Sequence, residues 1–137
     1  MKKILVPIDG SDCSMRALDR ARQLGELDAA EITLLTIVDS GRFIGLDFKQ
    51  GMINTGIEMA EDLLKKATDF LGEYQYGVKS THRVGDVADE IITMAEKEDF
   101  DLIVIGSRGL GTFKRAMLGG VSHKVISHAD TSVMVVK

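Results

Sequence analysis

A glycine-rich segment near the C-terminal end is the part of the sequence best suited to chemistry. The four residues 106–109 read Gly-Ser-Arg-Gly and follow a short apolar run, and Gly119 stands ten residues further along, where a helical pattern begins. Glycines let a backbone approach an anion closely, and the first N–H groups of a helix point toward it with the positive end of the dipole. The segment therefore predicts a site for phosphate, to which both chain regions contribute.

Nearby side chains would add charge and hydrogen bonds to this site. Arg108, Lys114 and Arg115 supply cations, and Ser122 supplies a hydroxyl one turn into the helix. The segment is neither the phosphate loop of the common NTPases, which needs Gly-Lys-Ser/Thr, nor the dinucleotide fingerprint, which belongs to the first strand–helix turn. Turns and close packing alone would be the structural alternative for the same glycines.

Other reactive residues give weaker signals. Asp9 follows the first apolar run, where it could cap a helix; a hydrolase that uses Asp9 or a histidine is a further alternative. His123 and His128 are five residues apart, about 140° around a helix, so they cannot hold one metal from one face. Cys13 falls in the first turn of a predicted helix, a position that lowers a thiol pKa, but a lone cysteine is usually inert. No metal site and no catalytic group are predicted.

The elements that must position these residues follow two hydrophobic patterns, which alternate along the chain: short apolar runs and segments of helical periodicity. Short apolar runs predict strands that are covered on both faces, and they lie at Ile4–Ile8, Ile32–Val38, Leu102–Ile105 and Val133–Val136. The alternating stretch Val78–Val84 predicts a half-exposed strand at or near a sheet edge.

Helical patterns separate the predicted strands. They cover residues 14–24 after Ser11 or Asp12 as N-cap, 53–71 with Gly72 beyond the end, 87–95 opened by Asp86, and 120–128. In the last helix we expect Val121, Val125 and Ile126 to face inward. The stretch Asp39–Gly51 has three glycines and no period, and is predicted to be a mobile loop or flap.

This alternation predicts an α/β fold: one doubly wound, parallel, five-stranded sheet with about four helices, formed by a single domain over residues 1–137. In such Rossmann-like folds ligands bind outside the carboxyl ends of the strands. The residues to inspect therefore follow Ile8, Val38 and Ile105.

Composition excludes several classes of protein. The net charge of −4 argues against a nucleic-acid binder, and Cys13 is the only cysteine of the 137 residues, so no disulfide forms within the chain. No apolar run is long enough for a membrane span, and the start lacks the features of a signal peptide. We expect a cytoplasmic protein that contacts neither nucleic acid nor membrane.

The whole pattern resembles the universal stress protein family, small adenine-nucleotide-binding α/β domains of the adenine nucleotide alpha hydrolase-like type. The resemblance covers essentially the full chain. It rests on the first strand and turn at Ile4–Ser11, on Gly106–Gly109 followed by Gly119, and on the closing segments His128-Ala129 and Val133–Val136. Family members that bind ATP carry Gly, two residues, Gly, nine residues, Gly, then Ser or Thr. This chain departs at the last position, where Gly120 stands.

The resemblance implies a role for each matching residue. Pro7 and Asp9 would flank the adenosine, with Asp9 accepting from a ribose hydroxyl, and the backbone of Val38 would meet the adenine edge. The phosphates would lie between two groups of residues, Gly106, Ser107, Arg108 and Gly109 on one side and Gly119, Gly120, Val121 and Ser122 on the other.

The resemblance also implies a function. We expect a stress-response protein that binds ATP, or AMP or ADP, with Mg²⁺ accompanying a triphosphate, and that pairs as a homodimer through its last strand. Hydrolysis of ATP would be slow at most. Because Gly120 lacks a hydroxyl, binding would be weaker or shifted toward AMP or ADP, with Ser122 as a substitute donor. The alternative is a dimeric signalling or partner-binding module of the same fold that does not bind nucleotides.

Overall fold

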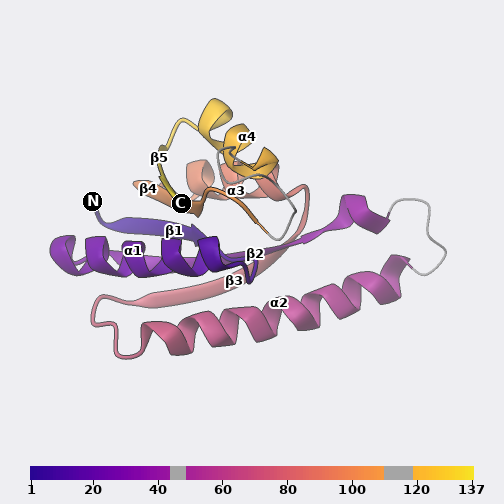
Figure 1. The fold of residues 1–137 in the computed structure, drawn as a ribbon, viewed down its shortest axis with the longest axis horizontal. Coiled ribbons are helices and arrows are strands. Elements are labelled where there is room, and N and C mark those ends of the chain that lie inside the picture. The colour runs from indigo at the N-terminus through magenta and orange to yellow at the C-terminus, as the bar shows by residue number, and fades with distance from the viewer. Residues whose placement is uncertain (44–48, 110–118) are drawn as a thin grey trace.

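A computed structural model describes residues 1–43, 49–109 and 119–137, in which strands and helices alternate (Figure 1). The strands are β1 (Lys3–Pro7), β2 (Glu31–Asp39), β3 (Val78–Gly85), β4 (Leu102–Gly106) and β5 (Ser132–Val136). The α-helices are α1 (Asp12–Asp28), α2 (Lys49–Leu71), α3 (Val87–Lys97) and α4 (Gly120–His128), and a short 3₁₀ helix, η1, covers Ser40–Phe43.

The five strands form one parallel sheet in the order β3-β2-β1-β4-β5. The predicted α/β fold is thus confirmed, including β3 at an edge. The switch point of this order lies between β1 and β4, because the helices after them lie on opposite faces. Ligands of doubly wound sheets bind at such a point.

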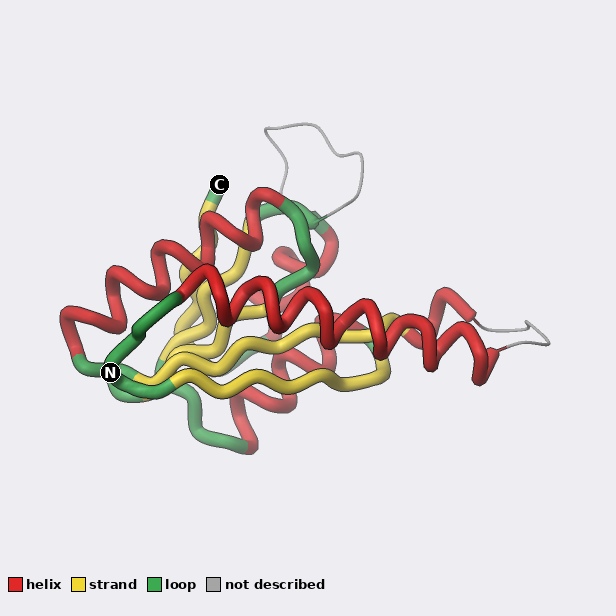
Figure 2. Tube along the Cα trace, turned by 90° about the horizontal axis from the view of Figure 1, so that it is seen from below, coloured by secondary structure: helices red, strands yellow, loops and turns green. Residues whose placement is uncertain are grey.

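Helices cover both faces of the sheet (Figure 2). Helices α1 and α2 pack on one face, in a core centred on Ile4, Val6 and Leu18, and helices α3 and α4 pack on the other, around Leu5, Ile91 and Val125. Alternate residues of β1 thus enter opposite cores. This explains why its sequence is apolar throughout rather than alternating.

The helix starts follow the capping rules. Ser11 caps α1 by accepting a hydrogen bond from the Ser14 N–H, and Asp86 caps α3 by accepting one from the Asp89 N–H. Helix α2 ends before Gly72, whose φ of 59° is left-handed. These three boundaries agree with the sequence predictions.

Two predictions about local structure were wrong. The Asp39–Gly51 stretch contains η1 and the start of α2, and only its residues 44–48 lie outside the described part. In α4, Val125 is buried, but Val121 and Ile126 are 37% and 42% exposed. The helix is short and packs through one narrow stripe, so residues on either side of Val125 reach the surface.

Among the described residues, no helix is both long and apolar enough to cross a membrane.

Candidate functional site

A cavity of about 940 Å³ lies at the carboxyl ends of β1, β2 and β4, beside the switch point of the sheet. All of the predicted site residues except Ser107 line it: Pro7, Asp9, Val38, Gly106, Arg108, Gly109, Gly119, Gly120, Val121 and Ser122. Its volume falls near the upper end of the range for small-molecule sites. Residues that are far apart in the sequence thus form one site large enough for a nucleotide.

The turn between β1 and α1 forms one wall of the cavity and is held by side-chain hydrogen bonds. The Thr36 hydroxyl donates to the Ile8 carbonyl (2.9 Å), and Asp9 Oδ1 accepts from the Ser11 N–H (2.9 Å). Gly10 makes the turn with a φ of 86°, a conformation that residues with a side chain rarely adopt. These contacts hold the Asp9 carboxylate at the cavity wall.

The loop after β4 closes against this turn. A Cβ added to Gly109 would lie 2.5 Å from Asp9 Oδ2, and the Ser11 hydroxyl reaches the Arg108 carbonyl at 3.5 Å. The loop and the Asp9 turn are therefore neighbours, and Gly109 is the residue that allows their close approach.

Gly106 has a packing role as well as a place in the cavity wall. A Cβ on Gly106 would lie 2.8 Å from the Cys13 backbone carbon and from its Cβ. The structural alternative for the glycines therefore holds at this position: a side chain there would push α1 away from β4.

The start of α4 forms the opposite wall. Its N-cap is Gly119, which has no side chain to accept from the first-turn N–H groups. Gly119 is held to the loop by a hydrogen bond from its N–H to the Ser107 carbonyl (2.7 Å). A Cβ on Gly120 would meet no atom within 4 Å, so this edge of the cavity is open.

The two serines of the predicted site make hydrogen bonds within the protein. The buried Ser122 hydroxyl donates to the Gly106 carbonyl (2.7 Å) and so connects α4 to the end of β4. The Ser107 hydroxyl contacts the Cys13 sulfur (3.9 Å) beneath the loop. In this arrangement both hydroxyls support the loop, and Ser122 is not free to replace the hydroxyl that Gly120 lacks. The predicted cations Lys114 and Arg115 lie outside the described residues.

The loop also affects the pKa of the Cys13 thiol. Burial alone would raise its pKa, but the net pKa is lowered, because the hydrogen bonds from Ser107 and the Arg108 backbone and the charges of Arg16 and Arg108 together outweigh burial. The thiol is 4% exposed and lies below the cavity wall rather than in it.

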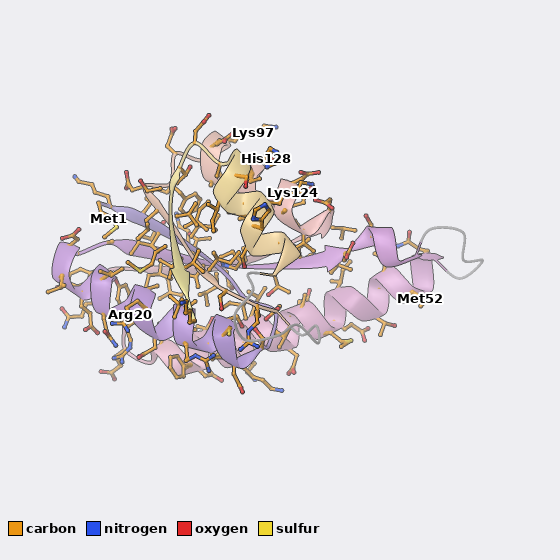
Figure 3. The ribbon with its side chains drawn as sticks, turned by 45° about the horizontal axis from the view of Figure 1, so that its top comes forward. Met1, Arg20, Met52, Lys97, Lys124 and His128 are labelled. Carbon is orange, nitrogen blue, oxygen red and sulfur yellow. The ribbon has the colours of Figure 1, made fainter. Side chains whose placement is uncertain are left out.

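Sequence reasoning missed the wall that α2 contributes. Met52, Gly56, Met59 and Leu63 recur at helical spacing and line the cavity, and Figure 3 shows Met52 in the first turns of α2, away from α4. A Cβ on Gly56 would lie 2.7 Å from Val38 Cγ1. A glycine inside a helix lowers the stability of the helix by about 1 kcal/mol relative to alanine, so a glycine there usually has a packing reason. Gly56 was therefore the sequence feature that could have indicated the close approach of α2 to β2.

Within the described ranges, no group of three or more His, Cys, Asp or Glu side chains is arranged to hold a metal ion.

Comparisons with known proteins agree with the fold and with the family resemblance. The universal stress protein family model matches residues 1–137. A universal stress protein of Methanocaldococcus jannaschii is 34% identical, over 99% of this chain and 82% of the relative.

Two solved structures are also similar. That of the hypothetical protein MJ0577 is 32% identical with a TM-score of 0.90, over 99% of this chain and 95% of the other. That of a universal stress protein in complex with cAMP is 27% identical with a TM-score of 0.76, over 99% and 97%. On the match of its full length to the family model, this chain belongs to the universal stress protein family.

Proposed function

We propose that this protein binds an adenine nucleotide, as ATP, ADP or AMP, in the cavity at the carboxyl ends of β1, β2 and β4, and that it acts in a stress response through that binding. The observation that carries the proposal is the convergence of the Asp9 turn, the Gly106–Gly109 loop and the start of α4 on one cavity. The relative solved with cAMP supports it.

Each wall of the cavity offers chemistry for one part of a nucleotide. The apolar side chains of Val38, Met59 and Leu63 suit a flat base, and the Asp9 carboxylate suits a ribose hydroxyl. The first-turn N–H groups of α4 and the Arg108 guanidinium suit phosphate. Hydrolysis of ATP would be slow at most, because these groups suit the binding of a nucleotide rather than the cleavage of its phosphate bonds.

A homodimer through β5 is the second part of the proposal. β5 is an edge strand whose residues Val133 to Val136 carry neither charge nor proline, the features that usually protect an edge from pairing. The other edge, β3, carries the exposed Lys79 and Arg83. A second copy is the partner that an unprotected edge fits best, because identical strands pair around a two-fold axis.

A matched pair of glycine substitutions tests the nucleotide site. Gly109→Ala would place a Cβ 2.5 Å from Asp9 Oδ2, whereas Gly120→Ala would place one in open space. We expect Gly109→Ala to weaken AMP and ATP binding at least about tenfold, the effect of losing one hydrogen bond to a charged group. Gly120→Ala should bind within about twofold of the parent by the same scale. Calorimetric titration of nucleotide-free protein measures both.

Two outcomes would contradict the proposal. If the parent protein fails to bind AMP or ATP with Mg²⁺ at millimolar concentration, the partner-binding module becomes the better hypothesis. If the parent binds but Gly109→Ala binds equally well with its fold intact by circular dichroism, the nucleotide lies elsewhere.

A further inference from the structure

The end of β5 is attached directly to the glycine loop. The Ser107 N–H donates to the Val136 carbonyl (2.7 Å), which extends the β4–β5 ladder by one bond into the loop. One residue further, the Lys137 carbonyl accepts from Arg16 Nε (2.9 Å). The last strand and the loop therefore share a boundary, to which α1 contributes Arg16.

The other arm of Arg16 reaches the floor of the loop. Its Nη2 atom lies 3.0 Å from Cys13 Sγ, and that sulfur contacts the Ser107 hydroxyl. Cys13 is also the residue against which Gly106 packs without a Cβ. One guanidinium thus joins the strand end to the two loop residues through a single buried sulfur.

The same strand end also carries the free edge of the sheet. In a strand, the N–H and C=O of one residue point to the same side, and successive residues alternate. Because the Val136 carbonyl bonds to β4, the backbone groups of Val133 and Val135 point away from the sheet. The loop and this outer row are therefore separated only by the hydrogen bond between Ser107 and Val136 and by the peptide bond from Val136 to Val135. A displacement of the loop would move the outer row.

We propose that Arg16 is a positioning residue that holds the end of β5 against the floor of the glycine loop, so that nucleotide occupancy and association of a second copy along β5 are coupled. This inference rests on the proposed function. Nucleotide binding fixes the loop, the loop fixes the Val136 end of β5, and a fixed strand pairs with its copy at less entropic cost. By linkage, each of the two sites in the dimer binds the nucleotide more tightly than the monomer does, by the square root of the factor by which saturating nucleotide tightens the dimer.

The experiment compares the dimer dissociation constant of nucleotide-free protein with and without saturating AMP, by analytical ultracentrifugation with fluorescence detection. We expect AMP to tighten the parent dimer at least about fivefold, the lower end of measured couplings between sites. In Arg16→Ala the ratio of the dimer dissociation constants without and with AMP should fall close to one. Arg16→Lys should give an intermediate ratio, because an ammonium keeps the charge but cannot reach the Lys137 carbonyl and the Cys13 sulfur together.

Arg20→Ala is the matched control. Arg20 lies one turn further along the same helix, on its outer surface in Figure 3, and its Nη1 atom donates to Gln23 Oε1 at 3.4 Å. Its removal takes away the same charge and the same type of side chain without touching the loop. It should therefore keep the parental ratio.

The result identifies which idea fails. A parent that binds AMP and dimerises but shows no change of dimer affinity with AMP overturns the coupling alone, as does an Arg16→Ala variant that keeps the parental ratio. A parent that stays monomeric overturns the coupling together with the β5 dimer. A parent that does not bind AMP overturns the proposed function and the coupling with it.

Discussion

At position 120 a Cβ would meet no atom within 4 Å, whereas at position 109 it would touch Asp9. Steric demand thus explains one glycine of the motif and not the other. Gly120 is the first residue of α4, where Ser or Thr would fit without displacing a neighbour. Compared with Ser or Thr, Gly120 provides one hydrogen-bond donor fewer at the end of the cavity proposed for phosphate. A substitution at position 120 can restore that donor.

Gly120→Ser should strengthen ATP binding by about 10- to 100-fold, because a hydrogen bond to a charged group contributes about 1.5–3 kcal/mol. Calorimetric titration with ATP and Mg²⁺ gives the affinity. Gly120→Ala is the control, since it stabilises the helix start to a similar degree but adds no donor. Equal affinities for the Ser and Ala variants would show that position 120 does not face the phosphates.

At the residue scale, the sequence was sufficient to select residues on two walls of the cavity, but neither the wall from α2 nor the hydrogen-bond partners of the selected residues. Asp9 and Gly109 were selected from the motif and the family resemblance that it carries, and they lie side by side. Ser122 lines the cavity, but its hydroxyl donates to the Gly106 carbonyl, a partner that the sequence did not indicate. A hydroxyl takes whichever acceptor its rotamer reaches, and sequence spacing does not contain that information.

Among the elements, α3 and α4 are joined by an ion pair between the N-terminal end of α3 and the middle of α4. Asp86 caps α3, and Lys124 of α4, labelled in Figure 3, lies 3.2 Å from Asp86 Oδ2 and 2.9 Å from Asp89 Oδ1. The hydrogen bond from the Asp89 N–H, and then the one from the Lys124 ammonium, hold the pKa of Asp86 below its usual value. Because α4 also forms the wall of the cavity, this contact helps to place the site.

The Asp86 contact makes a prediction about pH. Asp86→Asn keeps the cap but removes the charge, so it should lower the free energy of unfolding by less than about 1 kcal/mol at pH 7, as expected for an exposed ion pair. Since the folded-state pKa is lowered, the stabilisation is present above the unfolded pKa of about 3.9 and is lost as the pH falls through the folded value.

Urea denaturation of the parent and the Asn variant between pH 7 and pH 3 measures this difference, with Glu61→Gln on the exposed surface of α2 as control. The gap between parent and Asp86→Asn should shrink as the pH falls below about 4. A gap that is constant across this range would show that the carboxylate charge contributes nothing beyond the cap.

Elements with strong periodicity were predictable, and those whose limits depend on tertiary contacts were not. The four apolar runs and Val78–Val84 correspond to the five strands, and Asp86 was identified as a cap from its type and place. The stretch after β2 has no such period, and its 3₁₀ turn and the start of α2 were not predicted. Periodicity is informative only where one face is buried over several turns.

On the scale of the whole molecule, the two sheet edges differ in a way that the topology makes visible. β3 presents Lys79 and Arg83 to the surface, and Lys79 is paired with Glu31 of the neighbouring strand at 3.3 Å. β5 presents an uncharged outer row of backbone groups at Val133 and Val135. The sequence suggested which strand is apolar, but the identity of the edge came from the strand order β3-β2-β1-β4-β5.

Val135→Pro tests whether that outer row pairs two copies. Proline removes the N–H that points away from β4 and leaves the inward ladder at Val136 intact, so the chain should fold but lose the partner strand. Sedimentation equilibrium should show the parent as a dimer and this variant as a monomer, with a dimer dissociation constant raised at least about a hundredfold, or about 2.7 kcal/mol. Val135→Ala removes the same packing against the core but keeps the N–H, and it should remain dimeric. A proline variant that folds and still forms the parental dimer would place the interface on another surface, and the coupling through Arg16 would then have no strand to act on.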